Sequence, residues 1–361
     1  MVALLITGVL VLAACGSSST KTAATTTPAT TAAPAATDAP TTQAPSTTEA
    51  GAVDPAELDA LVTAAKAEGA LNFYSAGVKS TNDQVAAAFE KKYGIKVTMP
   101  ERTTDLVMLK RFLTELDAGG SPADLLQLTA QPPIKDAKDA GKLLSVDAMN
   151  IPGIKTYPKD AQTDYAVMVS VLITGLCYNT DQLKATDVDE WAKLKDPKVH
   201  MIFADPALTV PYSAFWLTAG LDVVKAVGQN QHVIAASTVP GFASLTAGEG
   251  NVLASCPEVL VKGGKAKGAP VAWASPSPPT GIQFGLSESA TAPHKAAARL
   301  FLYWATTEEG QAAFNGNGAG ASQAFPKGTG GSSVLDPAYK PFDYAAAKSA
   351  EAQIKELLGV K

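Results

Sequence analysis

Strand-like and helix-like patterns alternate between residues 54 and 126, and this order limits the possible folds more than any other feature. Apolar periodicity predicts strands over 71–74, 95–97 and 123–126, and helices over 55–68, 81–93 and 105–117. Gly94 and the pair Gly119-Gly120 follow two of these helices and are typical stop signals. Because this order is typical of a parallel sheet with right-handed crossovers, we expect an α/β fold.

The alternation resumes after residue 168. We expect strands over 169–178, 201–203, 251–255, 271–274 and 282–286, and helices over 211–221 and 344–358. Another helix takes Pro293 as its first residue and presents Ala297, Leu300, Phe301 and Trp304 on one face. The chain has 361 residues and a hydrophobic content of 46%, which is enough for two domains. We therefore expect two α/β lobes joined by crossing strands.

Local patterns also predict where some helices begin and which faces they bury. Asp54 with Pro55 caps the first helix, and the spacing from Thr81 to Gln84 and from Thr306 to Glu309 is that of a capping box. The helix over 105–117 places four leucines on one face, which we expect to be buried: Leu106, Leu109, Leu113 and Leu116.

The composition argues against several classes of function. A net charge of -5 without a basic block argues against general nucleic-acid binding. His200, His232 (in an expected helical region) and His294 (at a helix start) are scattered, so we expect no metal site. The chain lacks the Gly-x-Ser-x-Gly, His-Glu-x-x-His and Cys-x-x-Cys motifs of common enzymes. The glycine-rich stretch 316–320 follows a helix instead of a strand, so it predicts a turn, and we expect no cofactor.

The first residues are typical of a targeting signal. Residues 2–14 form an apolar run that is shorter than the roughly 20 residues needed to span a bilayer. The run ends in Leu12-Ala13-Ala14-Cys15, which resembles the lipobox of bacterial lipoproteins. This resemblance implies a signal peptide over 1–14 and acylation of the Cys15 thiol with a fatty acid such as palmitate. The lipid would anchor the protein to the cell membrane outside the cytoplasm; the alternative is an ordinary signal peptide with a chance cysteine.

Residues 16–50 have a low-complexity composition in which Thr, Ala, Pro and Ser supply 30 of the 35 residues. The segment contains no Leu, Ile, Val or aromatic residue, so it cannot bury enough apolar surface to offset its ordering entropy. We expect residues 15–53 to form a disordered stalk behind the lipid on Cys15.

Several short motifs, taken in order, resemble family 1 extracellular solute-binding proteins, and most of all their ferric-iron-binding subgroup. The motifs are AEGALNFYS (67–75), YGIKV (93–97), GSPAD (120–124), GLCYNT (175–180), ADP (204–206), APH (292–294) and EEGQ (308–311). The resemblance covers roughly residues 54–325. It implies a type 2 periplasmic-binding-protein-like fold, in which each lobe is a mostly parallel sheet flanked by helices and hinge strands join the lobes.

The same resemblance implies a domain layout and a function. Residues 54–175 would form the first lobe and 176–280 the second, and 281–361 would return to the first lobe and end in helices that pack across both. Such proteins capture a small molecule or an ion between the lobes and deliver it to an ABC permease, so we expect a monomeric receptor and no enzyme. The alternatives are a receptor for a membrane sensor, an exported enzyme and a stalked adhesin.

The candidate ligand-binding residues follow the carboxyl ends of expected strands, where loops and helix N-termini converge and favour anions. They are Tyr74, Ser75, Ala76 and Thr129 in the first lobe, and Thr209, Tyr212, Ser213 and Glu258 in the second. For the hydroxyl residues the alternative role is to cap a helix or to stabilise a turn.

Iron binding would require hard anionic donors, chiefly phenolates and carboxylates. The adjacent tyrosines of the ferric-iron-binding subgroup align with Glu258 and Val259 of this chain, and its early histidine aligns with Val78. The nine tyrosines of the chain include no adjacent pair. We therefore expect a small organic molecule or an oxyanion in preference to free ferric iron.

Cys177 and Cys256 are the two cysteines that remain when Cys15 carries the lipid. An isolated pair outside the cytoplasm favours a disulfide, and both residues lie on strands of the same expected lobe. The alternative is two buried thiols whose Cα atoms are too far apart for a bond.

Overall fold

The computed structural model describes residues 53–120, 122–129, 132–316 and 320–360. The expected signal peptide (1–14), the lipidated Cys15 and the stalk up to residue 52 lie outside the described residues. In the part of the chain that is described, no helix combines the length and the apolar character needed to cross a bilayer.

The first lobe begins with the alternation of helices and parallel strands that the sequence predicts. Its elements are α1 (Pro55–Glu68), β1 (Ala70–Ser75), α2 (Lys79–Tyr93), β2 (Lys96–Thr98), α3 (Asp105–Asp117) and β3 (Leu125–Thr129). β1 pairs in parallel with β2 on one side and with β3 on the other. The predicted α/β alternation is confirmed, and the bounds of α3 are the predicted ones.

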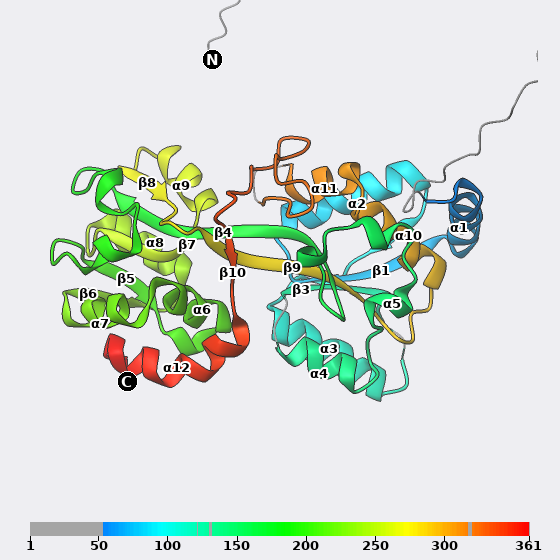
Figure 1. Ribbon diagram of the computed structural model, residues 1–361, viewed down its shortest axis with the longest axis horizontal. Coiled ribbons are helices and arrows are strands. Elements are labelled where there is room, and N and C mark those ends of the chain that lie inside the picture. Colours follow the sequence, from blue (N-terminus) through cyan, green and yellow to red (C-terminus); the bar gives the residue numbers. More distant parts are fainter. Residues whose placement is uncertain (1–52, 121, 130–131, 317–319, 361) are drawn as a thin grey trace, which may run out of the picture. The chain divides into compact units, whose positions relative to one another are not determined.

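Two long strands connect the first lobe to the second. After α4 (Pro132–Asp139) and α5 (Val146–Met149) the chain enters β4 (Val167–Asn179), which runs antiparallel to β9 (Thr280–Glu288). Figure 1 shows β4 and β9 side by side between the two groups of helices, with the short β10 (Lys340–Pro341) next to β9. The strand order β2-β1-β3-β9-β4-β7-β5-β6 means that one continuous sheet passes through both lobes.

The second lobe repeats the parallel arrangement. Its elements are β5 (Met201–Ala204), α6 (Val210–Ala219), α7 (Leu221–Gln229), β6 (His232–Ala235), α8 (Thr238–Ala247), β7 (Val252–Pro257), α9 (Glu258–Lys265) and β8 (Val271–Ala274). β5 pairs in parallel with β6 and β7, whereas β7 and β8 both run antiparallel to β4. Short 3₁₀ helices fill the connections, at Ile154–Thr156, Lys159–Ala161, Ala185–Asp187, Trp191–Lys195 and Pro206–Leu208.

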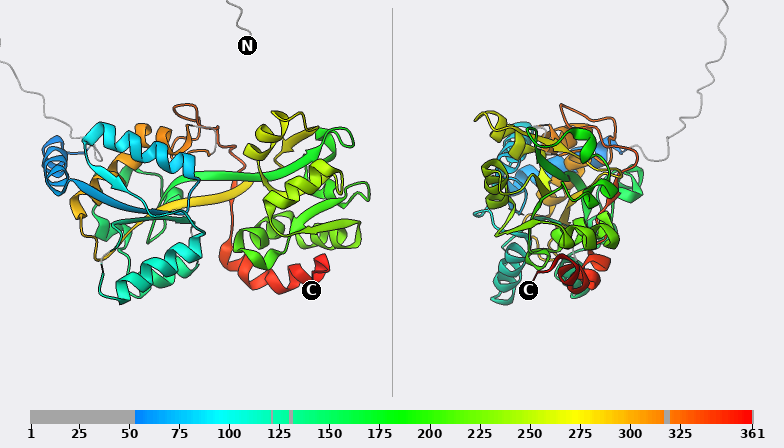
Figure 2. Two further views of the ribbon diagram at one scale, coloured as in Figure 1. Left: turned by 180° about the vertical axis from the view of Figure 1, so that it is seen from behind. Right: turned by 90° about the vertical axis from the view of Figure 1, so that its left-hand side faces the viewer.

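The segment after β9 contributes to both lobes. α10 (Lys295–Ala305) and α11 (Glu308–Asn315) add side chains to the first core, where Phe73, Phe89, Phe301, Trp304 and Phe314 form a cluster of rings. α12 (Tyr344–Leu358) packs against α6 and α7 and buries Ile354 and Leu358 in the second core. Both views of Figure 2 show α12 lying along the second lobe. Each lobe therefore has its own core, since burying apolar side chains is what stabilises either half.

The predicted starts of α2, α10 and α11, and one predicted element, are wrong. α2 begins at Lys79, two residues before the predicted cap at Thr81, which is itself buried within the first turn of the helix. α11 is capped by Thr307 and not by Thr306, since the Thr307 Oγ1 accepts a hydrogen bond from Gly310 N at 3.3 Å. His232 lies on strand β6, not in a helix.

The start of α10 shows why such local predictions fail. The helix begins at Lys295, so Pro293 is not its first residue as predicted. The carboxylate of Glu68 accepts hydrogen bonds from Ala296 N (3.1 Å) and Ala297 N (2.8 Å). Because Glu68 is 228 residues away from Ala296 in the sequence, no local pattern could have predicted this cap.

Candidate functional site

A cavity of about 400 Å³ lies between the two lobes, over the strands that cross between them. The first lobe contributes the ends of β1 and β3 and the start of α3, and the second contributes the starts of α6 and α8 and the end of β7. Side chains of β4 and β9 complete the lining, namely Leu172, Thr174, Ile282 and Phe284. The volume falls within the range of roughly 300–1,000 Å³ that is typical of sites for small organic ligands.

The first-lobe wall contains the two charged residues that line the cavity, Arg102 and Asp105. Arg102 lies in the loop between β2 and α3, and its Nε donates to the carbonyl oxygens of Ala76 (3.2 Å) and Gly77 (2.9 Å). Among the described residues, no carboxylate lies within ion-pair distance of the Arg102 guanidinium. Arg102 therefore supports the loop after β1 while its charge is left without an ion-pair partner.

The Asp105 carboxylate is engaged in holding the first lobe together. Its Oδ1 accepts a hydrogen bond from Thr129 N at 2.7 Å, which ties the end of β3 to the start of α3. Burial raises the pKa of Asp105, while hydrogen bonds from Thr129 and the positive charge of Arg102 act in the opposite direction. The carboxylate is thus a structural acceptor.

The second-lobe wall is built on the first turns of α6 and α8. Tyr212 lies in the first turn of α6, and its hydroxyl is 2.8 Å from Thr238 Oγ1 at the start of α8. Thr238 N also donates to the Tyr212 oxygen at 3.3 Å. These bonds fix the two helix starts relative to each other at the edge of the cavity.

One hydroxyl on the crossing strands has no partner. Thr174 of β4 lines the cavity and is 2% exposed, yet its Oγ1 makes no hydrogen bond within the described part of the chain. Its register neighbour on β9, Thr280, is equally buried but donates from Oγ1 to Lys340 O at 2.9 Å. An unsatisfied buried hydroxyl costs free energy, so a group that would bond to Thr174 would be stabilised there.

A bulge in β7 directs another hydroxyl residue toward the cavity. The pairing of β4 with β7 changes register between Gly175 and Cys177, and Ser255 within the bulge has φ 51°. A left-handed conformation is unfavourable for a residue with a side chain, and such conformations are common at functional sites. Ser255 and Pro257, on either side of Cys256, both line the cavity.

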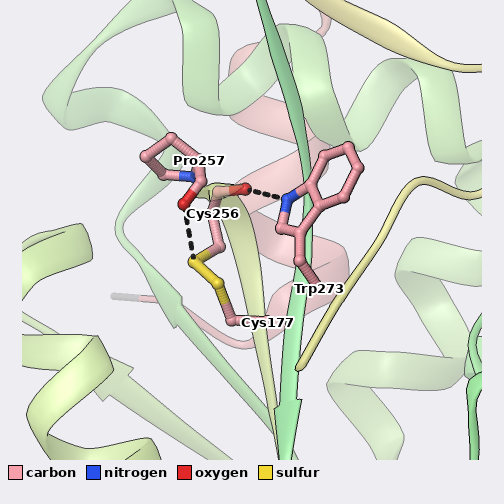
Figure 3. The surroundings of a disulfide bond; sticks show 4 residues. All are labelled: Cys177, Cys256, Pro257 and Trp273. Carbon is pink, nitrogen blue, oxygen red and sulfur yellow. Dashed lines mark hydrogen bonds between the residues drawn. A yellow bond between two sulfur atoms is a disulfide. The ribbon is translucent and has the colours of Figure 1, made fainter. Parts of the chain in front are cut away.

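A disulfide between Cys177 and Cys256 holds this bulge against β4, with the two Cα atoms 5.7 Å apart. Figure 3 shows the bond with Trp273 beside it, and Trp273 Nε1 donates to the carbonyl oxygen of Cys256 at 2.8 Å. Both sulfur atoms are buried in the second lobe. The covalent bond and the indole together fix the backbone that carries Ser255 and Pro257.

Large apolar side chains are exposed on both sides of the cavity. Val78 (40% exposed) and Leu106 (47%) line it from the first lobe, and Leu208 (54%) and Val239 (67%) line it from the second. Leu106 was expected on the buried face of α3 but is exposed, whereas Leu109 is buried as predicted. Leu113 and Leu116 are half-buried, and Met108 and Phe112 complete the buried face. Apolar residues that face each other across a cavity lose water contact when the lobes approach, which favours a closed state.

The helices that begin at the cavity lack caps from their own N-cap side chains. In the described residues, no N-cap side chain bonds the first turn of α2, α3, α6, α8 or α9, although the first N–H group of α8 is bonded to the Tyr212 hydroxyl. Their first residues or N-caps line the cavity: Val78, Thr104, Thr209, Thr238 and Pro257. By contrast, Asp54, Ser145, Thr307 and Asp343 cap α1, α5, α11 and α12 with their side chains. Uncapped helix N-termini present free N–H groups and partial positive charge.

Of the eight ligand-binding residues predicted from the sequence, four line this cavity: Ala76, Thr129, Thr209 and Tyr212. Glu258 lines a separate cavity of about 240 Å³ with Trp273 and Asp336, and its carboxylate is 3.9 Å from Lys262 Nζ.

The other three predicted residues are buried in bonds within their own lobe. The Tyr74 hydroxyl donates to Glu115 Oε2 at 2.9 Å, and burial together with the Glu115 charge raises the pKa of Tyr74. Ser75 donates to Gln127 Oε1 at 2.5 Å and also lines a small cavity of about 130 Å³, while Ser213 donates to Pro206 O at 2.9 Å.

Sequence reasoning missed Arg102, Thr174, Thr238 and Ser255, all of which line the cavity. Arg102 follows a predicted parallel strand, so the rule that sites lie beyond the carboxyl ends of strands could have found it. Ser255 was assigned to the last residue of a predicted strand and not to the site, because a bulge leaves no signal in the hydrophobic pattern.

The lining also bears on metal binding. No group of three or more His, Cys, Asp or Glu residues in the described ranges is arranged to hold a metal ion. Val78, which aligns with the early histidine of iron-binding relatives, lines the interlobe cavity, whereas Glu258 and Val259 line the smaller one. The three positions that would carry iron ligands are thus divided between two cavities.

Comparisons with known proteins agree with this fold. The family described as bacterial extracellular solute-binding protein matches residues 74–312. Among solved structures, the chain is similar to iron-bound HitA from Pseudomonas aeruginosa, with 19% identity and a TM-score of 0.59 over 79% of this chain and 99% of HitA. A comparison with curated protein sequences finds no match.

Two further solved structures contain other ligands. AfuA from Actinobacillus pleuropneumoniae, with fructose-6-phosphate bound, has 22% identity and a TM-score of 0.55 over 81% of this chain and 97% of AfuA. MotA from A. tumefaciens B6, in complex with glucopine, has 17% identity and a TM-score of 0.58 over 80% of this chain and 99% of MotA. At such identities the likeness extends to the fold alone.

Proposed function

We propose, from the premise that this chain belongs to the family of bacterial extracellular solute-binding proteins, that it captures a small solute between its lobes and delivers it to an ABC importer. The family match confirms the resemblance that the short sequence motifs indicated, and the solved structures confirm the two-lobed periplasmic-binding-protein fold. The family location is extracytoplasmic, and in our proposal a lipid on Cys15 anchors the receptor to the membrane.

The observation that carries this proposal is the cavity with walls from both lobes. Ala76, Arg102 and Thr129 come from one lobe and Thr209, Tyr212 and Ser255 from the other, while β4 and β9 form the part between them. A solute that contacts both walls binds the closed arrangement more tightly than the open one, so it shifts the population toward closure. The permease would then recognise the closed receptor.

The named relatives bind iron, a sugar phosphate and glucopine, so their fold does not select a ligand. The lining of this cavity favours an organic molecule or an oxyanion over bare ferric iron, because ferric iron needs several hard anionic donors. Among the described residues, Asp105 is the one carboxylate in the lining, and it already accepts a hydrogen bond from Thr129.

A thermal-shift screen of the full-length chain in mild detergent tests the receptor function. Ferric citrate, phosphonates, polyamines, organic acids and sugars are added separately, and a solute that binds the folded state raises the melting temperature by linkage. Small-angle X-ray scattering of the hits then measures compaction on closure. The proposal requires at least one hit that also compacts the protein.

A cavity-filling variant tests whether a hit binds in the interlobe cavity. Thr209→Trp places an indole at the exposed start of α6 inside the cavity, and it should abolish the shift caused by any hit. Thr186→Trp, on an exposed 3₁₀ helix of the same lobe outside this cavity, should leave it intact. Equal loss of binding in both variants, or no hit at all with the unchanged chain, would overturn the assignment.

Two further measurements test separately whether the receptor feeds an importer and whether a lipid anchors it to the membrane. Uptake of the radiolabelled hit should fall in cells that lack the receptor if it feeds an importer, whereas unchanged uptake with a lost transcriptional response would indicate a sensor. Cys15→Ser should release the protein from the membrane fraction if a lipid on Cys15 is the anchor.

A further inference from the structure

One positive side chain in the lining of the interlobe cavity has no ion-pair partner among the described residues. Of the two charged residues in the lining, Asp105 is committed to Thr129, while Arg102 bonds only carbonyl oxygens through Nε. The guanidinium has further N–H donors beyond Nε, and these suit carboxylate or phosphonate oxygens. Among the described residues, Arg102 is therefore the one positively charged side chain that lines the cavity.

The backbone adds to this positive field. Three helices that begin at the cavity, α2, α3 and α6, have ten or more residues, and no N-cap side chain bonds their first turns among the residues described. Their N-cap residues Val78, Thr104 and Thr209 all line the cavity. Because a helix N-terminus carries partial positive charge, three of them around one cavity favour an anion.

The Thr174 hydroxyl is a second, independent sign that the cavity suits a polar ligand group. It is buried in the lining and has no hydrogen-bond partner in the described part of the chain, although Thr280 beside it on the neighbouring strand is bonded. A hydroxyl can donate to an anionic oxygen or accept from a ligand N–H group. The buried Thr174 thus provides a bonding site for the polar end of a solute.

Most of the lining residues are apolar. More than half of the lining residues have aliphatic or aromatic hydrocarbon side chains, among them Val78, Leu106, Leu208, Val239 and Phe284. A cavity of about 400 Å³ is far larger than an inorganic oxyanion needs. An apolar ligand group would remove the apolar surface of this site from water, which is favourable, whereas a hydrated ion would not.

We infer that the solute is a small organic anion with an apolar body, whose anionic group binds beside Arg102, the Thr174 hydroxyl and the uncapped helix starts. This inference rests on the proposed receptor function and specifies its substrate class. The apolar body lies between the exposed side chains of the two lobes, where Val78 and Leu106 face Leu208 and Val239. Closure of the lobes would bury both ends of the molecule.

Matched sets of ligands test the class on the full-length chain. Three bodies are used, hexyl, phenylpropyl and indolylethyl, each with a carboxylate, an uncharged amide or an amine, and acetate supplies the charge without a body. Isothermal titration should show that the carboxylate of at least one body binds tenfold or more tightly than its amide, its amine and acetate.

The outcomes distinguish this inference from the receptor function. If a hit of the broad screen or of the matched sets is a cation, a neutral sugar or a ferric complex, the substrate class is wrong and the receptor function stands. If every carboxylate binds no better than its amide, the class is also wrong. If no solute of either screen binds or compacts the protein, both proposals fall.

Two pairs of variants test the residues. Arg102→Gln should weaken the carboxylate 10- to 100-fold and leave the matching amide unchanged, whereas Arg111→Gln, which removes an Arg paired with Glu115 on α3, should change neither. Arg102→Lys, which keeps the charge, should restore part of the selectivity. Equal weakening of carboxylate and amide in Arg102→Gln would show that Arg102 only supports the loop at Ala76 and would overturn its role in charge recognition.

The second pair compares Thr174 with Thr280. Thr174→Val should weaken the carboxylate at least fivefold without lowering the melting temperature, because the unbound protein loses no hydrogen bond. Thr280→Val should lower the melting temperature, because it removes the bond to Lys340, and leave the affinity unchanged. If Thr174→Val binds the carboxylate as tightly as the unchanged chain, the hydroxyl takes no part in binding.

Discussion

Helix starts at the cavity differ from helix starts elsewhere in the molecule. Asp54, Ser145, Thr307 and Asp343 cap helices at the periphery with their own side chains, whereas the helices around the cavity begin without such bonds. The neighbours Thr280 and Thr174 show the same contrast on one pair of strands. These four peripheral helix starts thus satisfy their own N–H groups, whereas the cavity leaves helix N–H groups and the Thr174 hydroxyl for a solute.

The first prediction concerns the disulfide that supports the second-lobe wall. Replacing Cys177 and Cys256 together by Ala should lower the free energy of unfolding by roughly 4 kcal/mol, because the bond closes a loop with a sequence separation of 79. Urea denaturation measures the change. An unchanged midpoint would contradict a bonded pair.

The second prediction tests a buried carboxyl of the first lobe, away from the cavity. Burial, and then the charge of Asp124, raise the pKa of Glu288 to about 8, and Glu288 is 4% exposed. Between its unfolded and folded pKa values the folded state holds a proton that the unfolded chain has lost, so stability should fall as pH rises from about 4.5 to 8.

Glu288→Gln cannot titrate and should lose this pH dependence. At pH 8 the variant should gain up to about 4 kcal/mol relative to the unchanged chain, as the pKa difference implies. Thermal denaturation across pH 5–8 measures it, and solute affinity serves as the control because Glu288 does not line the cavity. Parallel pH profiles for the two proteins would show that Glu288 is not the responsible group.

The third prediction compares a capped with an uncapped helix. Thr307→Ala should cost about 1 kcal/mol, since it removes the bond from Gly310 N. Thr209→Ala should cause only a few tenths of that loss of stability, because the Thr209 side chain caps nothing in the described structure. It should instead weaken solute binding. Differential scanning calorimetry of both variants, with and without the hit solute, measures both effects. Equal losses of stability would contradict the proposed difference between capped and uncapped helix starts.

The smallest effect is expected at Ser255. Ser255→Gly should raise stability by roughly 0.5 kcal/mol, because glycine accepts φ 51° without steric cost and this gain exceeds its added chain entropy. Ser287→Gly in the ordinary extended backbone of β9 should lower stability. A loss at both positions would show that the bulge carries no strain.

The sequence predicted the elements that follow from local periodicity. The bounds of α3, β8 and α12 are the predicted ones, because each has a regular apolar pattern and clear stop signals. The sequence predicted the helix α10 and its buried face, but not its start, because the cap Glu68 belongs to α1. It also could not predict β6, whose half-exposed side chains lack a clear apolar alternation.

The site was predictable only where it follows strand ends. Ala76 and Thr129 come directly after β1 and at the end of β3, so topology places them at the cavity. Tyr74 lies inside β1 and Ser213 in the first half of α6, and their hydroxyls form internal bonds to Glu115 and Pro206. Which way a side chain near a strand end or a helix start points depends on long-range packing, and this is also why Arg102 and Ser255 were missed.

The disulfide determines what happens when a protease cuts the second lobe. Cys177 and Cys256 close a covalent ring that encloses β5, α6, α7, β6, α8 and most of β7, the elements that carry the second-lobe wall. A protease that cuts once inside this ring produces two pieces that stay joined. The nicked molecule would migrate as one band in non-reducing electrophoresis and separate only after reduction, so a single cut in this region need not release the solute-binding wall.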